Sequence, residues 1–434
     1  MRQLGSIYEG LLEHRLRHAD QDLAVVKDNG TEVYTPLSDA ETPMEVVEQG
    51  ALYLETDASE RKKTGSYYTP HYVVEYIVEN TLEPILDERI DQFEAAVEKI
   101  NEIATGRDPE TPGVTAKLDK HRRRARDALL TIRVCDPAMG SGHFLVHAVD
   151  YITNRVGAAV LERDLKINPI QEHLDEIRGE ILDSLDEQGV QLDDAEDRLD
   201  DFTLLKRLVM KRCIYGVDLN PMAVELAKLS LWLRSFTVGA PLSFLDHHLK
   251  PGNSLIGTTV DEVRDALEAE GGQFEVFGGP FAGLLQATEL MQEVAQLSDA
   301  TVDEVRENAE RFAEYRDAMH PYKRVLDLWV SRHFGNERAE YLLRQFGTQV
   351  LDVFRGRADP ADETQRETLA TAAVLDDAKS FFHWELEFPE VYYDLDRAAG
   401  KTNPGFDAVI GNPPYVRIQS LSGRPGEVDY FTDP

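Results

Sequence analysis

Phe406–Gln419 reads FDAVIGNPPYVRIQ, and its residue types suggest chemistry as well as a turn. A run of β-forming residues stops at a glycine and an asparagine, and two prolines and a tyrosine follow. Two consecutive prolines fix two φ angles and remove two backbone N–H donors. A plain connecting turn needs neither this rigidity nor the amide and the aromatic ring beside it. We therefore interpret Asn412, Pro413, Pro414 and Tyr415 as a rigid turn that presents hydrogen-bond acceptors to a ligand.

An exocyclic amine on a planar ring is a substrate that suits such a turn. Its lone pair is delocalised into the ring, which makes the amine a poor nucleophile. The side-chain oxygen of Asn412 and the carbonyl of Pro413 would accept its two N–H bonds and aim the lone pair outward. Tyr415 would stack on the ring, which contributes about 1–3 kcal/mol for a nucleobase, and a base in a duplex must first be flipped out. A rigid connector is the simpler interpretation, but it leaves Asn412 and Tyr415 unexplained.

Two further segments predict a cofactor site. Val134–Leu145 reads VCDPAMGSGHFL, a strand ending in Asp136, then a glycine loop and the start of a helix. Glycines let a ligand approach the backbone closely, and a helix N-terminus favours a negative group. Ile214–Leu233 begins IYGVDLNP and repeats the pattern, with Asp218 at the strand end where dinucleotide folds bind ribose hydroxyls. Plain strand–helix turns remain the alternative, because the residues after Asp218 also fit a simple helix cap.

The histidines form no complete metal site in the sequence. His143 and His147 lie one helical turn apart, and His247 and His248 are adjacent, but neither pair has an evident third ligand. We therefore predict no metal.

The elements that must position these residues alternate between strands and helices. Strands are expected from Ile132, at Cys213–Leu219, at Leu242–Leu245 and at Phe406–Ile410, and helices follow the first two. This alternation predicts a mostly parallel α/β sheet with helices on both faces. The first 113 residues should hold a helix at Gln3–Leu16, a hairpin at Leu23–Leu37 turning at Asn29 and Gly30, a strand in Ala51–Thr56, helices at Tyr72–Ile85 and on to about Ala104, and a loop at Gly106–Gly113.

Composition limits the partners and the compartment. The 434 residues carry a net charge of −34, yet a hydrophobic content of 42% argues against wholesale disorder. Acid is spread over nearly all segments, which indicates adaptation to high salt. At ~1 M salt the Debye length is about 3 Å, so nucleic acid remains an allowed partner. The two cysteines lie in apolar runs typical of buried thiols, and no membrane span or signal peptide is evident, so we expect a cytoplasmic protein.

In these motifs the chain resembles the S-adenosylmethionine-dependent amino-methyltransferases, and specifically the DNA adenine-N6 methyltransferases. DPAMGSGHF resembles their cofactor loop, GVDLNP their ribose-binding acid and GNPPY their catalytic motif, in the order of the family. TGSYYTP at Thr64–Pro70 is similar to a motif that closes over the methionine end of the cofactor in one branch. GNSLIG at Gly252–Gly257 occupies the place of the adenine contact. FHWELEFPEVYYD resembles a segment of the large methylases of type IIG restriction–modification and BREX phage-exclusion systems.

The resemblance implies a Rossmann-like class I methyltransferase sheet, incomplete on its C-terminal side. It implies an N-terminal helix and β-hairpin segment at residues 1–60, a methyltransferase core at 61–157, 202–259 and 400–434, an acidic helical insertion at 158–201 and a second helical insertion at 260–399. Asn412, Pro413, Pro414 and Tyr415 would be catalytic. Many relatives have aspartate in place of Asn253. The residues implied to bind S-adenosyl-L-methionine are Thr69, Pro70, Asp136, Pro137, Ala138, Gly140, Gly142, Phe144, Asp218, Leu219, Asn253 and Leu255.

The implied reaction is methyl transfer to a flipped-out adenine of double-stranded DNA, in restriction–modification or phage defence, with a restriction nuclease or another defence component as a further partner. No metal, covalent intermediate or strong base is required. Relatives continue well past NPPY with more strands and a target-recognition domain. We therefore expect a truncated chain whose partner is the missing C-terminal segment. Phe406–Ile410 should be an apolar sheet edge, and the chain alone should bind cofactor weakly and transfer no measurable methyl groups.

Three alternatives stay open. A protein-glutamine N-methyltransferase also uses NPPY, on an amide nitrogen, but such chains are shorter and lack TGSYYTP and the long insertions. A non-catalytic cofactor- or DNA-binding fragment would keep the fold. An NAD-dependent dehydrogenase would leave GNPPY without a role. The basic segment His121–Arg126 would touch phosphates or form a helix face against acidic neighbours, and we favour the second interpretation.

Overall fold

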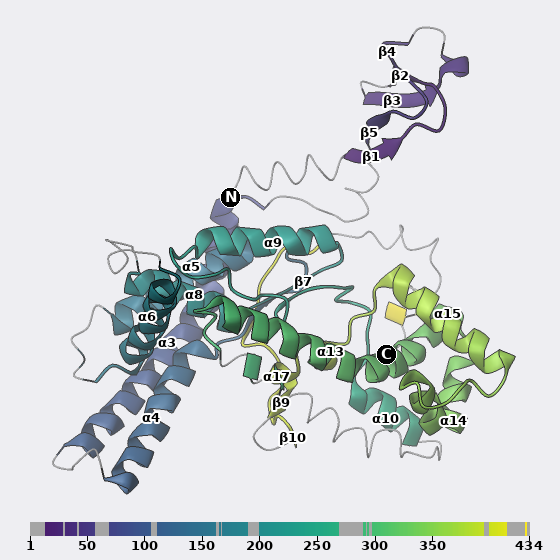
Figure 1. Cartoon of the computed structure of the whole chain (residues 1–434). Coiled ribbons are helices and arrows are strands. Elements are labelled where there is room, and N and C mark those ends of the chain that lie inside the picture. Colours follow the sequence, from purple (N-terminus) through teal and green to yellow (C-terminus); the bar gives the residue numbers. More distant parts are fainter. Residues whose placement is uncertain are drawn as a thin grey trace. The chain divides into compact units, whose positions relative to one another are not determined.

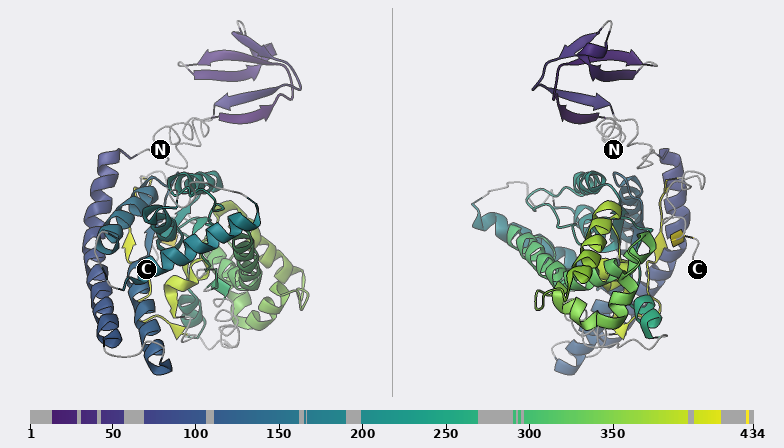
Figure 2. Two further views of the ribbon diagram at one scale, coloured as in Figure 1. Left: turned by 60° about the vertical axis from the view of Figure 1, so that its left-hand side comes forward. Right: turned by 90° about the vertical axis from the view of Figure 1, so that its right-hand side faces the viewer.

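The computed structural model of the chain describes residues 14–28, 31–40, 43–56, 69–105, 111–161, 165, 167–189, 199–268, 290, 291, 293, 294, 297–394, 399–414, 430 and 431. The chain forms two compact units, one of residues 1–69 with 413–415 and one of residues 70–412 with 416–434. Both are drawn in Figures 1 and 2.

The first unit contains two small antiparallel sheets. In one, β2 (Leu23–Asp28) pairs with β3 (Thr31–Pro36) and β4 (Glu45–Val47), and a short 3-10 helix, η1 (Leu37–Asp39), follows β3. This confirms the predicted hairpin, whose Asn29 and Gly30 lie outside the described residues.

In the other sheet, β1 (His14–His18) pairs with β5 (Leu52–Thr56), which confirms the strand predicted in Ala51–Thr56. The predicted helix Gln3–Leu16 is wrong at its last three residues, because His14–Leu16 are extended and paired with β5. Its earlier residues lie outside the described part of the chain.

The second unit is built on a parallel sheet with the order β11-β6-β7-β8 among the described residues. The four strands are β6 (Val134–Asp136), β7 (Ile214–Asp218), β8 (Leu249–Pro251) and β11 (Ala408–Val409). A mixed α/β fold with a parallel sheet is therefore confirmed. Within the described residues β11 pairs with β6, and Val409 is 61% exposed.

The strand predicted at Leu242–Leu245 is wrong, and β8 lies a few residues later. The backbone of the segment is bonded to side chains instead of a neighbouring strand. Trp232 Nε1 donates to the carbonyl of Ser243, and the N–H of Phe244 donates to Asp299. Short apolar runs do not reveal such competition for backbone groups.

The two faces of this sheet are covered differently. Val134 and Ile214 face a large core shared with helices α5 (His143–Val160), α8 (Asp201–Cys213) and α9 (Pro221–Arg234). The alternate residues Cys135 and Tyr215 face an aromatic cluster that includes Phe382, Phe388 and Val391. The segment FHWELEFPEVYYD, with the short helices α16 (Trp384–Glu387) and α17 (Pro389–Tyr392), thus covers the second face. Cys135 and Cys213 are buried free thiols, as predicted.

Helix α3 (His71–Ala104) is continuous, so the predicted division into two helices is wrong. Pro84 lies inside it, where a proline removes one backbone hydrogen bond. The buried stripe Val78, Leu82 and Leu86 continues across the proline, and its packing outweighs that loss.

Helix α4 (Pro112–Leu130) runs beside α3 as the second arm of a hairpin (Figures 1 and 2). It begins with a proline inside the loop predicted at Gly106–Gly113, so that prediction is wrong at its end. Within the basic segment His121–Arg126, Arg122 pairs with Glu172 of α6 (Pro169–Glu187) at 3.1 Å, in accord with a helix face against acidic neighbours.

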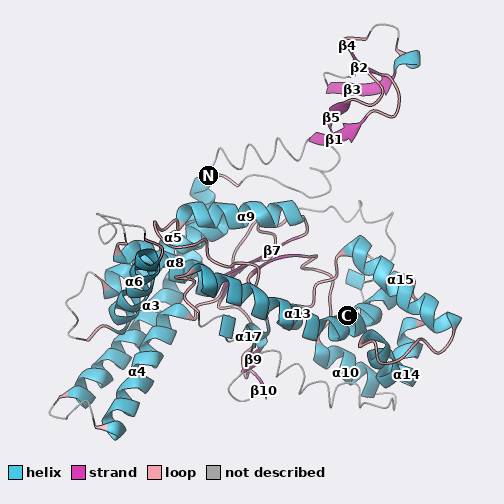
Figure 3. Cartoon of the chain, viewed as in Figure 1, coloured by secondary structure: helices cyan, strands magenta, loops and turns pink. Residues whose placement is uncertain are grey.

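Residues 260–394 add a largely helical region with its own hydrophobic core (Figure 3). Tyr315 and Trp329 are among the largest buried side chains there. None of the helices in the described part of the chain is both long and apolar enough to cross a membrane. The elements of this region are α10 (Val260–Glu268), α13 (Val302–Ser331), η2 (Arg332–Phe334), α14 (Ala339–Phe354), α15 (Glu363–Lys379) and β9 (Tyr393–Asp394), which pairs with β10 (Ala399–Gly400).

Candidate functional site

The carboxyl ends of four parallel strands meet at one edge of the sheet, which is where open α/β folds bind ligands. There β6 ends in Asp136 and β7 ends in Asp218. Next to β6, β11 leads to Asn412, and next to β7, β8 leads to Asn253. The topology therefore brings the motifs DPAMGSGHF and GVDLNP and the first two residues of GNPPY, Gly411 and Asn412, to one edge.

The loop after β6 is fixed by hydrogen bonds to the end of β7. The N–H of Gly140 donates to Asp218 Oδ2 at 2.9 Å, and the N–H of Met139 donates to the carbonyl of Val217 at 3.0 Å. Gly140 and Gly142 adopt φ angles of 54° and 80°, the left-handed region that glycine enters without strain. A side chain at Gly142 would also press on Ala227, 3.1 Å from its Cβ position. The glycines are required by the loop itself.

Asp136 is a buried carboxyl group with a strongly altered charge state. It is 1% exposed and accepts one hydrogen bond, from the N–H of Ala138 to Oδ1 at 3.0 Å. Burial raises the pKa of Asp136 from 3.8 to about 7; the Ala138 N–H opposes this rise, and the nearby Asp218 adds to it. Near neutral pH this group is therefore poised between its neutral and charged forms.

Asp218 is less enclosed and has two backbone donors. The N–H groups of Asn220 and Gly140 bond to its two oxygens at 2.8 and 2.9 Å. Burial raises the pKa of Asp218, and these two bonds oppose the rise. Asn220 also caps α9, its side chain accepting from the N–H of Met222 with Pro221 at the first helical position. The cap and the strand-end acid are thus both present.

Gly411, the first residue of the GNPPY motif, lies close to Asp136. The N–H of Ile410 donates to the carbonyl of Cys135 at 2.9 Å, so β11 stays in register with β6 up to the motif. A Cβ atom on Gly411 would lie 2.6 Å from Asp136 Oδ1, closer than real Cβ contacts. Glycine is therefore needed at the first position of GNPPY, and the partly buried Asn412 is the next residue along the chain.

The rest of the turn remains a prediction. Pro413 and Pro414 are exposed, and the division between the two units falls between Asn412 and Pro413. Tyr415 lies outside the described residues. That Asn412 and Pro413 form a pair of acceptors is therefore not tested by the described residues.

Asp407 anchors the start of β11, and the sequence analysis missed it. Its Oδ2 accepts from the N–H of Arg133 at 2.8 Å, just before β6, and its Oδ1 pairs with Arg89 of α3 at 2.7 Å. The signal available in the sequence was an acid one residue before a short apolar strand, which is too common to single out.

On the other side of β7, the segment after β8 is tied to the same edge. The N–H of Gly252 donates to the carbonyl of Asp218 at 2.9 Å, and the N–H of Asn253 donates to the carbonyl of Ser380. The side chain of Asn253 accepts from the N–H of Leu255 at 3.2 Å, so it shapes its own turn.

Two apolar side chains stand exposed at these strand ends. Leu219 follows β7 and is 48% exposed, and Leu255 follows β8 and is 69% exposed. Solvent-exposed leucines are common, but these two follow neighbouring strands, one of which ends in the acid Asp218.

The other predicted cofactor residues are placed unevenly. Pro137 and Ala138 lie in the loop, and Phe144 packs into the core at 4% exposure, where it supports the loop. Pro70 caps α3 and Thr69 precedes it, and the division between the two units falls between them. Thr64–Tyr68 of TGSYYTP lie outside the described residues.

The histidines differ from the sequence expectation in one respect. His143 and His147 on α5 have a third histidine beside them, His71, the first residue of α3. The sequence analysis found no third ligand because His71 lies far away along the chain. His247 and His248 are buried next to each other directly before β8.

Comparison with known proteins gives two family matches. The family model described as Eco57I restriction-modification methylase matches residues 212–433, just over half of the chain. That described as MmeI, DNA-methyltransferase domain, matches residues 114–250.

A Methanocaldococcus jannaschii protein provisionally named type II restriction enzyme and methyltransferase RM.MjaORFECS2P is 26% identical over 398 residues. The alignment covers 83% of this chain and 28% of that protein, so the chain spans little more than a quarter of its relative. No solved structure matches the chain.

Proposed function

Because the chain belongs to the Eco57I restriction-modification methylase family, we propose that it takes part in transferring a methyl group from S-adenosylmethionine to the N6 amine of adenine in double-stranded DNA. The observation that carries this proposal is the contact of Gly411 with Asp136, which sets Asn412 of the predicted catalytic turn beside the predicted cofactor loop. The proposed setting is a restriction–modification or phage-defence system.

The residues at the strand ends fit this cofactor. S-adenosylmethionine carries two positive groups, and a nearby positive charge favours the ionised form of an acid such as Asp136, whose pKa of about 7 reflects an uncompensated burial. Asp218 keeps further lone pairs on both oxygens for ribose hydroxyls. Leu219 and Leu255 provide exposed apolar surface for the adenine ring.

Bound S-adenosylmethionine would supply an activated methyl group, so the protein's task is to orient the amine. The side-chain oxygen of Asn412 and the carbonyl of Pro413 would accept the two N–H bonds of the adenine amine. Gly411 and Asp407 hold Asn412 in place, and Pro414 stiffens the turn. Such preorganised acceptors act most strongly in an enclosed site and need no reorganisation during the reaction.

The net charge of −34 makes salt a condition of DNA binding. At low ionic strength the acidic surface would repel the phosphate backbone. At ~1 M salt the Debye length is about 3 Å, so repulsion reaches only groups almost in contact. We therefore propose that the chain engages duplex DNA in concentrated salt, and assays should be run there.

Cofactor identity is tested by calorimetry on the 434-residue chain in molar salt. We expect S-adenosylmethionine and its demethylated product to bind with one site, and NAD to give no heat above dilution. Tighter binding of NAD would contradict the proposal and favour a dinucleotide enzyme.

Base identity is tested with labelled cofactor and unmethylated duplex DNA. Two proteins are compared: the 434-residue chain alone, and the same chain extended by the C-terminal part of a longer family member. We expect N6-methyladenine after digestion to nucleosides. A product on cytosine would contradict the adenine assignment, and transfer to glutamine of a protein substrate would favour the protein methyltransferase alternative.

The role of Asn412 is tested by Asn412→Ala in whichever form transfers methyl groups. Losing a preorganised transition-state contact costs about 2.7–4 kcal/mol, which is a fall of ~10²–10³ in rate. Cofactor affinity should be unchanged. Asn403→Ala is the matched control, since Asn403 is an exposed asparagine that also precedes a proline. Equal methyl-transfer rates for the two variants would contradict the proposed role of Asn412 as an acceptor for the adenine amine.

A further inference from the structure

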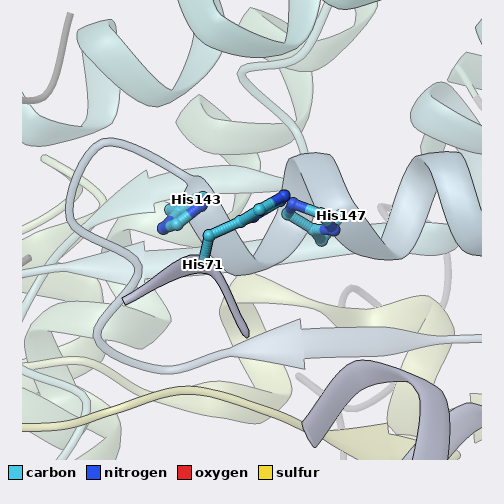
Figure 4. Close-up of side chains that lie close together, drawn as sticks. All are labelled: His71, His143 and His147. Atoms are coloured by element: carbon cyan, nitrogen blue, oxygen red, sulfur yellow. The ribbon is translucent and has the colours of Figure 1, made fainter. Parts of the chain in front are cut away.

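Three histidines that the proposed reaction does not use meet where two helices begin (Figure 4). His71 opens α3, while His143 opens α5 and His147 lies one turn further along it. Each offers a ring nitrogen, and these nitrogens all lie within 4.8 Å of one another. The rings of His71 and His147 are 4.4 Å apart between centroids.

The arrangement has the spacing of a transition-metal site. His143 and His147 are separated by four residues, which places both rings on one face of the helix. A tetrahedral zinc ion with Zn–N bonds of ~2.0–2.1 Å needs nitrogens about 3.4 Å apart. His71 is exposed, so its side chain can rotate to close the remaining gap. Three imidazoles and one open position are a ligand set that zinc accepts.

The charge state of the histidines also suits a ligand role. Burial, followed by the neighbouring histidines, lowers the pKa of His143 to about 4, and burial also lowers the pKa of His147. The neutral imidazole is the form that binds metals. Glu75 and Asp150 lie near enough to His147 to favour positive charge there, while Arg234 opposes it.

The other buried histidine pair provides a contrast. Burial lowers the pKa of both His247 and His248, the charges of Lys211 and Lys250 add to this, and Glu390 opposes it at His248. A cation placed beside His247 would therefore meet two positive side chains. Among the described residues, the His71 group is the one set of three His, Cys, Asp or Glu side chains with the spacing of a metal site.

We propose that His71, His143 and His147 bind one divalent transition-metal ion of the zinc class. The ion clamps the first turn of α3 to the first turn of α5. Because α5 begins directly after Gly142 of the predicted cofactor loop, the ion also fixes one end of that loop. Its role is structural, and the methyl-transfer chemistry does not depend on a metal.

The test is a Co²⁺ titration of the full chain, purified without a polyhistidine tag and stripped with chelator. Excess Mg²⁺ is kept present to occupy exposed carboxylates, which bind hard cations and are abundant on this chain. We expect one equivalent of Co²⁺ with the intense visible absorption of a four-coordinate nitrogen site. Zn²⁺ should displace it and raise the midpoint of thermal unfolding.

His71→Gln and His147→Gln should each weaken Co²⁺ binding at least tenfold and abolish the four-coordinate spectrum. His320→Gln on α13 is the control, because His320 is an exposed helical histidine outside the cluster. His71 is itself exposed, so its replacement leaves the core intact and far-ultraviolet circular dichroism should be unchanged. Equal Co²⁺ affinity in wild type and His71→Gln, or only six-coordinate weak spectra, would overturn the proposal.

Discussion

The ends of β6 and β7 carry the same residue type in different surroundings. Asp136 is 1% exposed, accepts one backbone N–H and lies against Gly411. Asp218 is partly exposed and accepts an N–H from each of two segments. The first therefore has a pKa of about 7, while the second is better compensated and joins the loop to its strand. The end of a strand fixes the position of an acid. The neighbours of that acid decide whether its charge changes near neutral pH, as at Asp136, or whether it joins two segments through hydrogen bonds, as at Asp218.

The sharpest way to test this contrast is the pH dependence of stability in Asp136→Asn. An acid whose pKa is higher in the folded than in the unfolded state destabilises the fold as it ionises. The loss begins near the unfolded value of 3.8 and is complete above about 7. At ~1.4 kcal/mol per unit, wild type should lose about 2–3 kcal/mol relative to Asp136→Asn between pH 5 and pH 7.5.

Urea unfolding at several pH values measures this difference, with the exposed Asp317→Asn as the control. Parallel pH profiles for wild type and Asp136→Asn would mean that Asp136 is ionised without cost, and the contrast with Asp218 would fail. If the proposed cofactor binds, its affinity in wild type should rise with pH through 7, since the ionised acid attracts its positive charge.

Gly411→Ala tests whether the end of β6 also positions the catalytic turn. The added Cβ would lie 2.6 Å from Asp136 Oδ1, and this short buried side chain cannot move away freely. We expect a loss of about 1–3 kcal/mol in stability from overpacking. A displacement of Asn412 by ~1 Å would reduce methyl transfer about 10²-fold.

Gly179→Ala in α6 is the matched control, because Gly179 is helical and no atom lies within 4 Å of its Cβ position. That change should stabilise the chain by about 0.5–1 kcal/mol. If Gly411→Ala behaved in the same way, the contact between the two motifs would play no part.

Asp218→Ala tests the hydrogen bonds by which Asp218 joins the loop after β6 to the end of β7. It removes the acceptor of the Gly140 and Asn220 N–H groups, and we expect cofactor affinity to fall by about 1–3 kcal/mol. The stability of Asp218→Ala should depend less on pH than that of wild type. This reduction should be smaller than the one caused by Asp136→Asn. Calorimetry and urea unfolding provide both values, and unchanged affinity would remove Asp218 from the cofactor site.

The smallest effect on cofactor affinity is expected at Leu255, which follows β8. Leu255 is 69% exposed, so Leu255→Ala should change stability by less than about 0.5 kcal/mol. Cofactor affinity should fall by a few fold if the adenine ring lies on this side chain. A matched change at Val374, which is 66% exposed on α15, should leave affinity unchanged. Equal affinities in both variants would place the ring elsewhere.

The sequence was most informative where local pattern and chemistry coincide. The strand, glycine loop and helix around Asp136 and the repeat around Asp218 follow from hydrophobic runs broken by residues with special backbone demands. Both strands and both helices were predicted correctly. That GNPPY forms a site stays a prediction, made from its residue types alone.

What failed depended on long-range contacts. The segment Leu242–Leu245 satisfies its backbone through Trp232 and Asp299, which no local pattern reveals. Helix α3 continues through Pro84 because buried residues on both sides of the proline, Leu82 and Leu86, pack on the same core. Asp407 bonds to Arg133, and His71 lies beside His143 and His147, all of them far along the chain, so only the fold could show these contacts.

The short pairing of β11 with β6 also determines the order in which the site is assembled during synthesis. Arg133 and Asp407, which flank this pairing, are 274 positions apart. At ~5–20 residues per second, the ribosome releases the two partners tens of seconds apart. For that interval the edge of β6 that will pair with β11 stays unpaired. Residues 260–394 can meanwhile bury a core of their own, which shortens the loop between Arg133 and Asp407. The predicted cofactor loop can therefore form early, and the turn at Asn412 joins it only after β11 has paired with β6.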